Sequence, residues 1–333
     1  MKLEFYKGSA TTSRARTSNV STIIMSSNHS LITGDTVTIS GLGGTGYNDS
    51  DVTITVTNST TFTYTNTGTN EGTTGDTDGL VFPNFTFPYN ARLHSVRPNK
   101  YVDQRDFPYN FSYFGTTNPL KTRLSFTITG HFSSTNKSTN FRSLAKFGNS
   151  NKLMKFYMDP SSPDRFAIVI PNAPERTDTG NRTNFVDYVM LMTSPFGILF
   201  DETQQSGAYN GSDSNAGDVF APIEKITGTT SAGTVTIKDK DGNGITFTSS
   251  GGATVIYLIY QTDLGANNLF TEYIYAEVGG TKQVLAVATD GQEMVTGLDP
   301  GETLTTRFNS GSSSIAGFSA GPTFFFRNGH SSI

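Results

Sequence analysis

The sequence predicts an all-β protein with more than one domain. Short runs alternate between apolar and polar residues with a period of two, and clusters of Gly, Asn, Asp and Ser separate them. Such alternation is typical of antiparallel strands with one buried face, because successive side chains of a strand point to opposite faces. The chain has 333 residues, which exceeds the usual size of one domain. Its 25 Phe and 14 Tyr residues supply enough apolar area for real cores, although Trp is absent.

Composition limits the classes of function. With no Cys, the chain offers no disulfide scaffold, no thiolate metal site and no Cys nucleophile. The net charge of −4 argues against nucleic acid as the main partner. We expect no secretory leader, because the first residues lack an apolar core, and no membrane span, because no apolar stretch approaches about 20 residues. The sequence therefore predicts neither nucleic-acid binding nor membrane binding.

Residues 19–82 are predicted to form a small inserted β module. Runs such as DTVTISG, DVTITVT and TTFTYTN alternate strictly between turns, whereas TGTNEGTTGDTDG holds almost no apolar residue and should be a flexible loop. The module resembles a short β-domain of phage structural proteins, in which TTFTY follows a pattern matched here by His29, Leu31, Gly34, Asp35, Val37, Ile39 and Gly41. No second ligand lies at metal spacing from the His, which favours a turn-forming role for it.

Residues 1–18 together with residues 83–200 are predicted to form a larger N-terminal domain, a β-sandwich or barrel-like fold with one short helix. From Val81 to Gly115, aromatic residues are interleaved with Pro, Arg and Lys, which favours edge strands or an extended arm, because Pro cannot donate to a central ladder. Such an arm packs within its own chain or pairs with a neighbouring subunit. We expect the second, with the subunit interface at Phe107, Tyr109, Phe111 and Tyr113.

A strand, a helix and three more strands are expected after the arm. LKTRLSFTITGHF alternates cleanly, and the apolar residues around Leu144 then follow the spacing of a helix face. Ser138 or Thr139 is the expected cap of this helix, and Gly148 its end. KLMKFYM, DRFAIVIP and NFVDYVMLMT supply the three strands, and two of them are apolar enough to be central.

Residues 201–217 are predicted to form a linker and residues 218–333 a second β-sandwich. The linker is rich in Ser, Gly, Asn and Asp. Short strands with turns between them follow it, and the last two are ETLTTRFN and PTFFFRNG. Because Pro cannot continue a ladder, we expect the last strand before the linker to end in an interdomain hinge at Pro195, Phe196 and Gly197.

The order of these elements resembles the siphophage distal tail protein family. Strand, short helix, strand, RFAIVIPNAPER and a long strand that closes in Ser-Pro-Phe-Gly resemble the family's N-terminal domain, and GLDPGETLTTRF resembles the end of its galectin-like C-terminal domain. The resemblance implies a structural subunit of a phage tail tip. It implies a homo-oligomeric ring, expected to be a hexamer, that joins the tail tube protein to the tail hub protein in the virion tail, after assembly in the host cytoplasm.

Motifs that would carry chemistry are weak. Asp239, Asp241 and Asn243 follow the spacing of a calcium loop, but the loop lacks its final acid and its flanks alternate as strands, so a tight hairpin explains the same residues. Neighbouring carboxylates such as Asp201 and Glu202 fall on opposite strand faces, and GLGGTG lacks the Lys of a phosphate loop. We therefore expect no catalytic residues, no metal and no cofactor.

A second hypothesis is that the C-terminal sandwich is a carbohydrate- or receptor-binding module at the virion surface. Galectins stack their sugar on a Trp, which this chain lacks, and a shared fold does not confer the activity. The candidates for stacking on a host-surface glycan are Tyr257, Tyr260, Tyr273 and Tyr275, and ordinary packing suits them equally well. The sequence favours the structural role.

Overall fold

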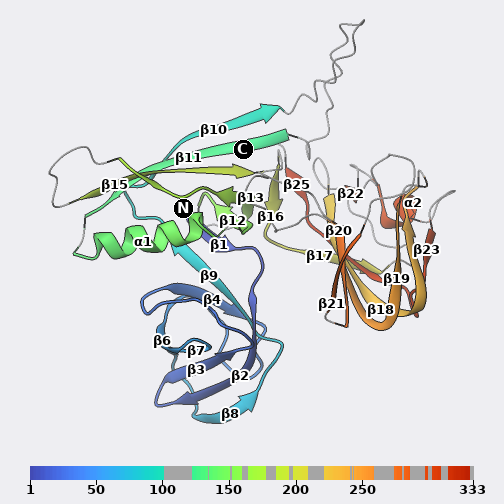
Figure 1. Cartoon of the computed structure of the whole chain (residues 1–333), viewed down its shortest axis with the longest axis horizontal. Helices are drawn as coiled ribbons and strands as arrows, with labels where there is room; N and C mark the ends of the chain where they lie inside the picture. Colours follow the sequence, from blue (N-terminus) through green and yellow to red (C-terminus); the bar gives the residue numbers. More distant parts are fainter. Residues whose placement is uncertain are drawn as a thin grey trace, which may run out of the picture. The chain divides into compact units, whose positions relative to one another are not determined.

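The computed structural model describes residues 1–100, 122–133, 135–150, 152–159, 164–177, 185–194, 198–208, 221–240, 242, 244–258, 274–279, 281–285, 297–298, 302–308 and 314–330. These residues divide into two compact units (Figure 1). Unit 1 lies within Met1–Asn99, Leu124–Pro163 and Ala167–Ser194, and unit 2 within Lys100–Arg123, Asp164–Phe166 and Pro195–Ile333. Antiparallel strands dominate both units, which confirms the all-β class.

Unit 1 begins with a small, strongly curved arrangement of strands. They are β1 (Lys2–Phe5), β2 (Ser9–Thr17), β3 (Val20–Met25), β4 (Thr36–Ser40), β5 (Asp49–Thr53), β6 (Thr55–Asn58), β7 (Thr61–Thr65), β8 (Glu71–Gly75) and β9 (Leu80–Thr86). β3 pairs with β2 and β7, β7 with β6, and β4 with β5 and β9. Alternate residues of β3, β4 and β7 enter one apolar core, which includes Ile23, Val37, Ile39, Tyr47 and Phe62. The period-two pattern therefore marks the buried faces of these strands.

The strand pairing of the small module reaches beyond residues 19–82. β2, which the sequence assigned to the larger domain, pairs with β3 from Thr11 to Thr17. Ser18 and Asn19, with φ angles of 51° and 62°, close this hairpin in the left-handed region that two-residue turns require. The expectation of a flexible loop at residues 67–79 is wrong, because β8 pairs with β2 there. A ladder is built from backbone groups, so a segment with few apolar side chains can still join it.

The motif that resembles a phage β-domain lies on the turns around β4. Gly34 before the strand and Gly41 after it have φ angles of 95° and 77°, which favour Gly. A Cβ at Gly41 would also lie 2.5 Å from the backbone oxygen of Asp78. The ring Nδ1 of His29 accepts the backbone N–H of Leu31 at 2.9 Å, which confirms a turn-forming role for the histidine.

The larger part of unit 1 contains one helix among long strands. Its elements are β10 (Arg92–Lys100), β11 (Thr122–Phe132), α1 (Lys137–Gly148), β12 (Met154–Tyr157), β13 (Arg165–Pro171), β14 (Glu175–Arg176) and β15 (Val186–Ser194). β1 pairs with β9 and β12, and β12 pairs with β13. β15 pairs with β11 from Val186 to Ser194 and also with β13 and β14. β10 runs alongside β11 (Figure 1). The predicted order of strand, helix and three strands is confirmed.

β9 is paired on both sides, so the expectation of an edge strand is wrong there. On one side, Leu80 to Asn84 pair with β4. On the other side, β9 pairs first with β2 at Leu80 and Val81 and then with β1 from Asn84 onward. Pro83 falls at the change between these two partners, where a missing N–H breaks no ladder bond.

The ends of α1 differ in part from the prediction. Asn136 is the N-cap residue, so neither Ser138 nor Thr139 caps the helix, and the Asn side chain makes no capping hydrogen bond. The helix does end at Gly148. A Cβ at this glycine would lie 2.4 Å from the backbone oxygen of Asn172, so only Gly allows the end of the helix to approach that segment.

Unit 2 is built on one antiparallel sheet. Its elements are β16 (Leu199–Asp201), β17 (Gln205–Ala208), β18 (Ala221–Lys238), β19 (Gly244–Tyr257), β20 (Ile274–Val278), β21 (Thr281–Leu285), β22 (Gly297–Leu298), α2 (Leu304–Phe308), β23 (Ser314–Ala316), β24 (Thr323–Phe326) and β25 (Gly329–His330). The strand order of the sheet is β17-β24-β18-β19-β20-β21. β22 and β23 pair with β18, and β16 pairs with β25.

Two expectations for this unit are wrong. Residues 205–208, placed in a linker by composition, form β17 and pair with β24. ETLTTRFN contains α2 rather than a strand. Thr303 Oγ1 accepts the N–H of Thr306 at 3.1 Å, as a helix cap does, and the buried residues Leu304, Arg307 and Phe308 follow helical spacing. The capped helical pattern outweighed the strand propensity of the Thr residues.

Candidate functional site

Most of the predicted site residues lie outside the described part of the chain. This holds for the interface residues Phe107, Tyr109, Phe111 and Tyr113, and for the hinge residues Pro195, Phe196 and Gly197. Both assignments stay predictions.

The calcium-loop candidate falls on a hairpin. Asp241 and Asn243 are not among the described residues, but Asp239 is fully buried and its backbone oxygen accepts the N–H of Gly242 at 3.1 Å. Lys238 pairs with residue 244 across β18 and β19, which confirms the tight hairpin. Within the described ranges, no group of three or more His, Cys, Asp or Glu side chains is placed to hold a metal ion. No described helix is long and apolar enough to cross a membrane.

One charged cluster lies in unit 2. His330 Nε2 lies 2.7 Å from Asp201 Oδ1, and Arg327 Nε donates to Glu224 Oε1 at 2.9 Å. Arg327 Nη1 also donates to the backbone oxygen of Asp201 at 3.0 Å. These contacts join β16, β18 and β25 to the segment that follows β24. Each side chain of the cluster has a polar partner within the cluster, so we assign the cluster a structural role.

A second cluster lies in the small module, and sequence reasoning missed it. The guanidinium groups of Arg14 and Arg16 lie 4.9 and 4.1 Å from the ring centre of Tyr47. Arg14 Nη1 pairs with Asp76 Oδ2 at 3.0 Å, and Arg16 Nη2 donates to the backbone oxygen of Thr45 at 3.1 Å. The cluster therefore holds the glycine-rich loop GLGGTG against β2, which gives that loop a structural role.

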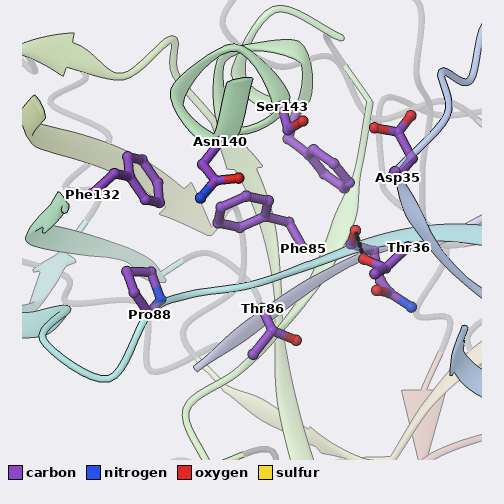
Figure 2. A pocket seen from close by; sticks show the side chains of 11 residues that line it. Asp35, Thr36, Phe85, Thr86, Pro88, Phe132, Asn140 and Ser143 are labelled. Atoms are coloured by element: carbon purple, nitrogen blue, oxygen red, sulfur yellow. Dashed lines mark hydrogen bonds between the residues drawn. The ribbon is translucent and has the colours of Figure 1, made fainter. Parts of the chain in front are cut away.

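The site with room for a ligand is a pocket in unit 1. Its volume is about 240 Å³, and it lies between the start of β4, the end of β9, the end of β11 and one face of α1 (Figure 2). The lining residues are Gly34, Asp35, Thr36, Asn84, Phe85, Thr86, Pro88, Phe132, Asn140, Ser143 and Phe147. Aromatic rings and polar groups thus meet in one small space.

Three rings form the apolar part of the pocket. The ring centre of Phe85 lies 6.2 Å from that of Phe132 and 6.0 Å from that of Phe147. The ring of Phe132 stacks on that of Tyr188, with the two ring centres 4.9 Å apart, and this contact fixes the orientation of the Phe132 ring. In Figure 2, the amide of Asn140 is seen between the rings of Phe132 and Phe85, and Ser143 follows on the same helix. The helix therefore offers polar groups to an aromatic surface.

The charged residues at the pocket neutralise each other. Asp35 Oδ2 lies 2.8 Å from Lys146 Nζ and accepts the backbone N–H of Ile32 at 3.0 Å. Lys146 projects from the same helix as Asn140, so this ion pair joins the turn before β4 to α1. The negative charge of Asp35 and the positive charge of Lys146 cancel, so these two residues give the pocket no net charge.

A chain of hydrogen bonds fixes the orientation of Asn84. Lys2 Nζ lies 3.1 Å from Glu4 Oε2, and that oxygen also accepts the hydroxyl of Thr38 at 2.8 Å. The Thr38 hydroxyl has one hydrogen, which it donates to this carboxylate. It must therefore accept a hydrogen bond from Asn84 Nδ2, which lies 3.0 Å away. Asn84 is 2% exposed, and its Oδ1 has no hydrogen-bond partner among the described residues.

The same chain affects the titration of Lys2. Burial lowers its pKa, but the carboxylates of Glu4 and Asp51 outweigh burial and leave the pKa above its ordinary value. Lys2 is therefore charged across the neutral range, and Glu4 stays paired. The amide of Asn84 is accordingly held in one orientation by a charged network.

No sequence signal marked this pocket as a site. Gly34 and Asp35 appeared, but only as two positions of the motif that resembles a phage β-domain. The lining residues come from segments around positions 35, 86, 132 and 143, which only the tertiary structure brings together.

No protein-family model matches the chain, and a search of curated proteins finds no relative of it. The resemblance to distal tail proteins therefore rests on the residues and the order of elements alone.

Proposed function

We propose that this chain is a non-enzymatic structural subunit of a phage tail tip. Six copies would form a ring in the virion tail that joins the tail tube protein to the tail hub protein, after assembly in the host cytoplasm. The observation that carries the proposal is the order of elements in unit 1. β11, α1, β12, β13 and β15 follow one another along the chain in the order in which the sequence resembles the N-terminal domain of distal tail proteins.

The surface of unit 1 also supports an assembly role. Leu191 and Phe185 are 47% and 38% exposed at β15 and its start, although neighbouring residues of the strand are buried. The segment between β10 and β11 carries the aromatic residues expected at the interface. A ring closes head to tail, and strands exchanged between subunits would remove edges that otherwise invite aggregation.

The test replaces the aromatic residues of the arm. We expect the triple change Phe107→Ser, Phe111→Ser and Tyr113→Ser to yield monomers in sedimentation velocity, with an unchanged far-ultraviolet circular dichroism spectrum. Tyr89→Ser is the matched control, because the Tyr89 side chain is fully exposed and lies outside the predicted interface at residues 107–113. A triple variant that still sediments as a ring would contradict the proposed interface.

The C-terminal carbohydrate hypothesis has weaker support. Tyr257 is half-buried, and its backbone is opposite residue 275 in the register of β19 and β20, so its position is that of an ordinary residue in a sheet. Tyr260 and Tyr273 are not in the described ranges. This function stays a prediction.

A further inference from the structure

A buried amine, a carboxylate and an amide share one face of the strands β1 and β9. Asn84 lies directly opposite Glu4 in the register of these strands, and Lys2 lies opposite Thr86, which is the diagonal position on the same face. Diagonal neighbours in an antiparallel pair are about 7–8 Å apart, within reach of a long side chain. Asn84 is 2% exposed and Glu4 7%, and the side chain of Lys2 is 11% exposed. Little water therefore reaches these three side chains.

Hydrogen bonds connect the three groups into one path for protons. Lys2 Nζ lies 3.1 Å from Glu4 Oε2, and that oxygen accepts the hydroxyl of Thr38 at 2.8 Å. The Thr38 hydroxyl accepts from Asn84 Nδ2 at 3.0 Å. Asp51 also pairs with Lys2, at 2.8 Å, but its side chain is 49% exposed. Glu4 is therefore the buried base beside the amine, and the amide nitrogen lies at the other end of the path.

This set of groups can join a lysine to an asparagine. Burial disfavours the charged forms of Lys2 and Glu4, so the transfer of a proton from the ammonium to the carboxylate costs less there than it does in water. The transfer leaves a neutral amine, which is a nucleophile, beside the side-chain amide of Asn84. The reaction has to occur only once in each chain, so a slow rate is sufficient.

We propose that Lys2 and Asn84 form an intramolecular isopeptide bond, with Glu4 as the general base. After Glu4 has taken one proton from Lys2, a bond forms between Lys2 Nζ and Asn84 Cγ, and the bond between Cγ and Nδ2 breaks. Glu4 and the Thr38 hydroxyl pass the two protons that Nζ loses to the leaving nitrogen. That nitrogen departs as ammonium, Glu4 is ionised again, and no atom is oxidised or reduced.

The bond would close a loop around the small module. The strands β2 to β8 all lie between residues 2 and 84 in the sequence. No disulfide can close this loop, because the chain has no Cys. The isopeptide bond would restrict the unfolded chain as a disulfide does, so it should raise the melting temperature of unit 1.

Intact-mass spectrometry of the full chain tests the proposal. After storage at neutral pH until the mass stops changing, we expect a mass that is lower than that of the sequence by one ammonia molecule. A protease digest should then yield a branched peptide in which residue 2 is linked to residue 84. Lys2→Arg keeps the positive charge beside Glu4 but removes the nucleophile, and Glu4→Gln removes the base. Each of these variants should have the full mass of its own sequence.

Lys152→Arg is the matched control, because Lys152 is exposed and lies outside this network. It should lose ammonia as the unchanged protein does. Succinimide formation at an asparagine also releases ammonia, but it needs no lysine. The proposal therefore fails if the unchanged protein keeps the full mass, or if Lys2→Arg still lacks one ammonia molecule. A loss of ammonia in Glu4→Gln would contradict the role of Glu4, and a branched peptide that contains a different lysine would overturn the assignment of Lys2.

Discussion

Gly130 and Tyr188 offer a sharp test of the register between β11 and β15. They lie directly opposite each other in that register. A Cβ at residue 130 would lie 2.6 Å from the Tyr188 hydroxyl, 2.9 Å from its Cζ and 3.1 Å from Cα of Ala91. Tyr188 is 1% exposed and stacked on Phe132, so it cannot withdraw. We therefore expect Gly130→Ala to destabilise unit 1 by about 1–3 kcal/mol, the usual cost of overpacking.

Tyr188→Phe tests the same contact from the other side. The Tyr188 hydroxyl is buried without a hydrogen-bond partner among the described residues, so its removal should stabilise unit 1 by about 1 kcal/mol. It would also remove the shortest of the three contacts made by a Cβ at residue 130. When Tyr188→Phe is present, the change Gly130→Ala should therefore cost about 1 kcal/mol less than it does in the unchanged protein.

The assay is urea denaturation followed by circular dichroism, with Gly72→Ala as the matched control. Gly72 lies in β8, and a Cβ there would meet nothing within 4 Å. The reasoning is refuted if Gly130→Ala lowers the free energy of unfolding no more than Gly72→Ala does. It is also refuted if Gly130→Ala costs as much with Tyr188→Phe present as without it. Either result would mean that residues 130 and 188 are not opposite each other.

Two further predictions concern buried charge and pH. Arg14→Met should destabilise the small module by about 3–5 kcal/mol in urea denaturation, because the buried carboxylate of Asp76 loses its ion pair; Arg142→Met, at an exposed position of α1, should have little effect. Burial raises the pKa of Tyr188 above its ordinary value of 10.0, so the folded state keeps a proton that the unfolded state releases. The stability that this difference contributes is complete below about pH 10 and is lost as the pH rises further. Between about pH 9 and pH 11, the melting temperature of Tyr188→Phe should therefore fall less than that of the unchanged protein. An identical decline in both proteins would contradict the assigned burial.

Local patterns of the sequence predicted the strands whose burial alternates. β4 and β7 show period two in the sequence and in the structure, because one face of each packs against the module's core. The helix α1 was predicted from the helical spacing of the apolar residues around Leu144, whereas β12 and β13 are buried almost throughout and were predicted from short apolar runs. The glycines of the motif around β4 also have a structural reason. Gly34 and Gly41 lie in turns and have positive φ angles, which other residues rarely adopt.

Long-range pairing was not visible in the sequence. β2 and β8 have few apolar residues, and only their backbone ladder assigns them to the small module. α2 was mistaken for a strand because its Thr residues favour strands, whereas the cap at Thr303 selects a helix. The pocket could not be predicted at all. The hydrogen bonds from Asn84 to Thr38 and from Thr38 to Glu4 likewise depend on strand pairing that the sequence does not show.

The native mass in solution tests the central claim most directly. Sedimentation equilibrium on the full chain, supported by negative-stain images, measures it without assumptions about shape. We predict one closed species of six times the 35.9 kDa subunit mass, seen as a ring. A monomer at every concentration tested would contradict the proposal that this chain is a ring-forming subunit of a phage tail tip.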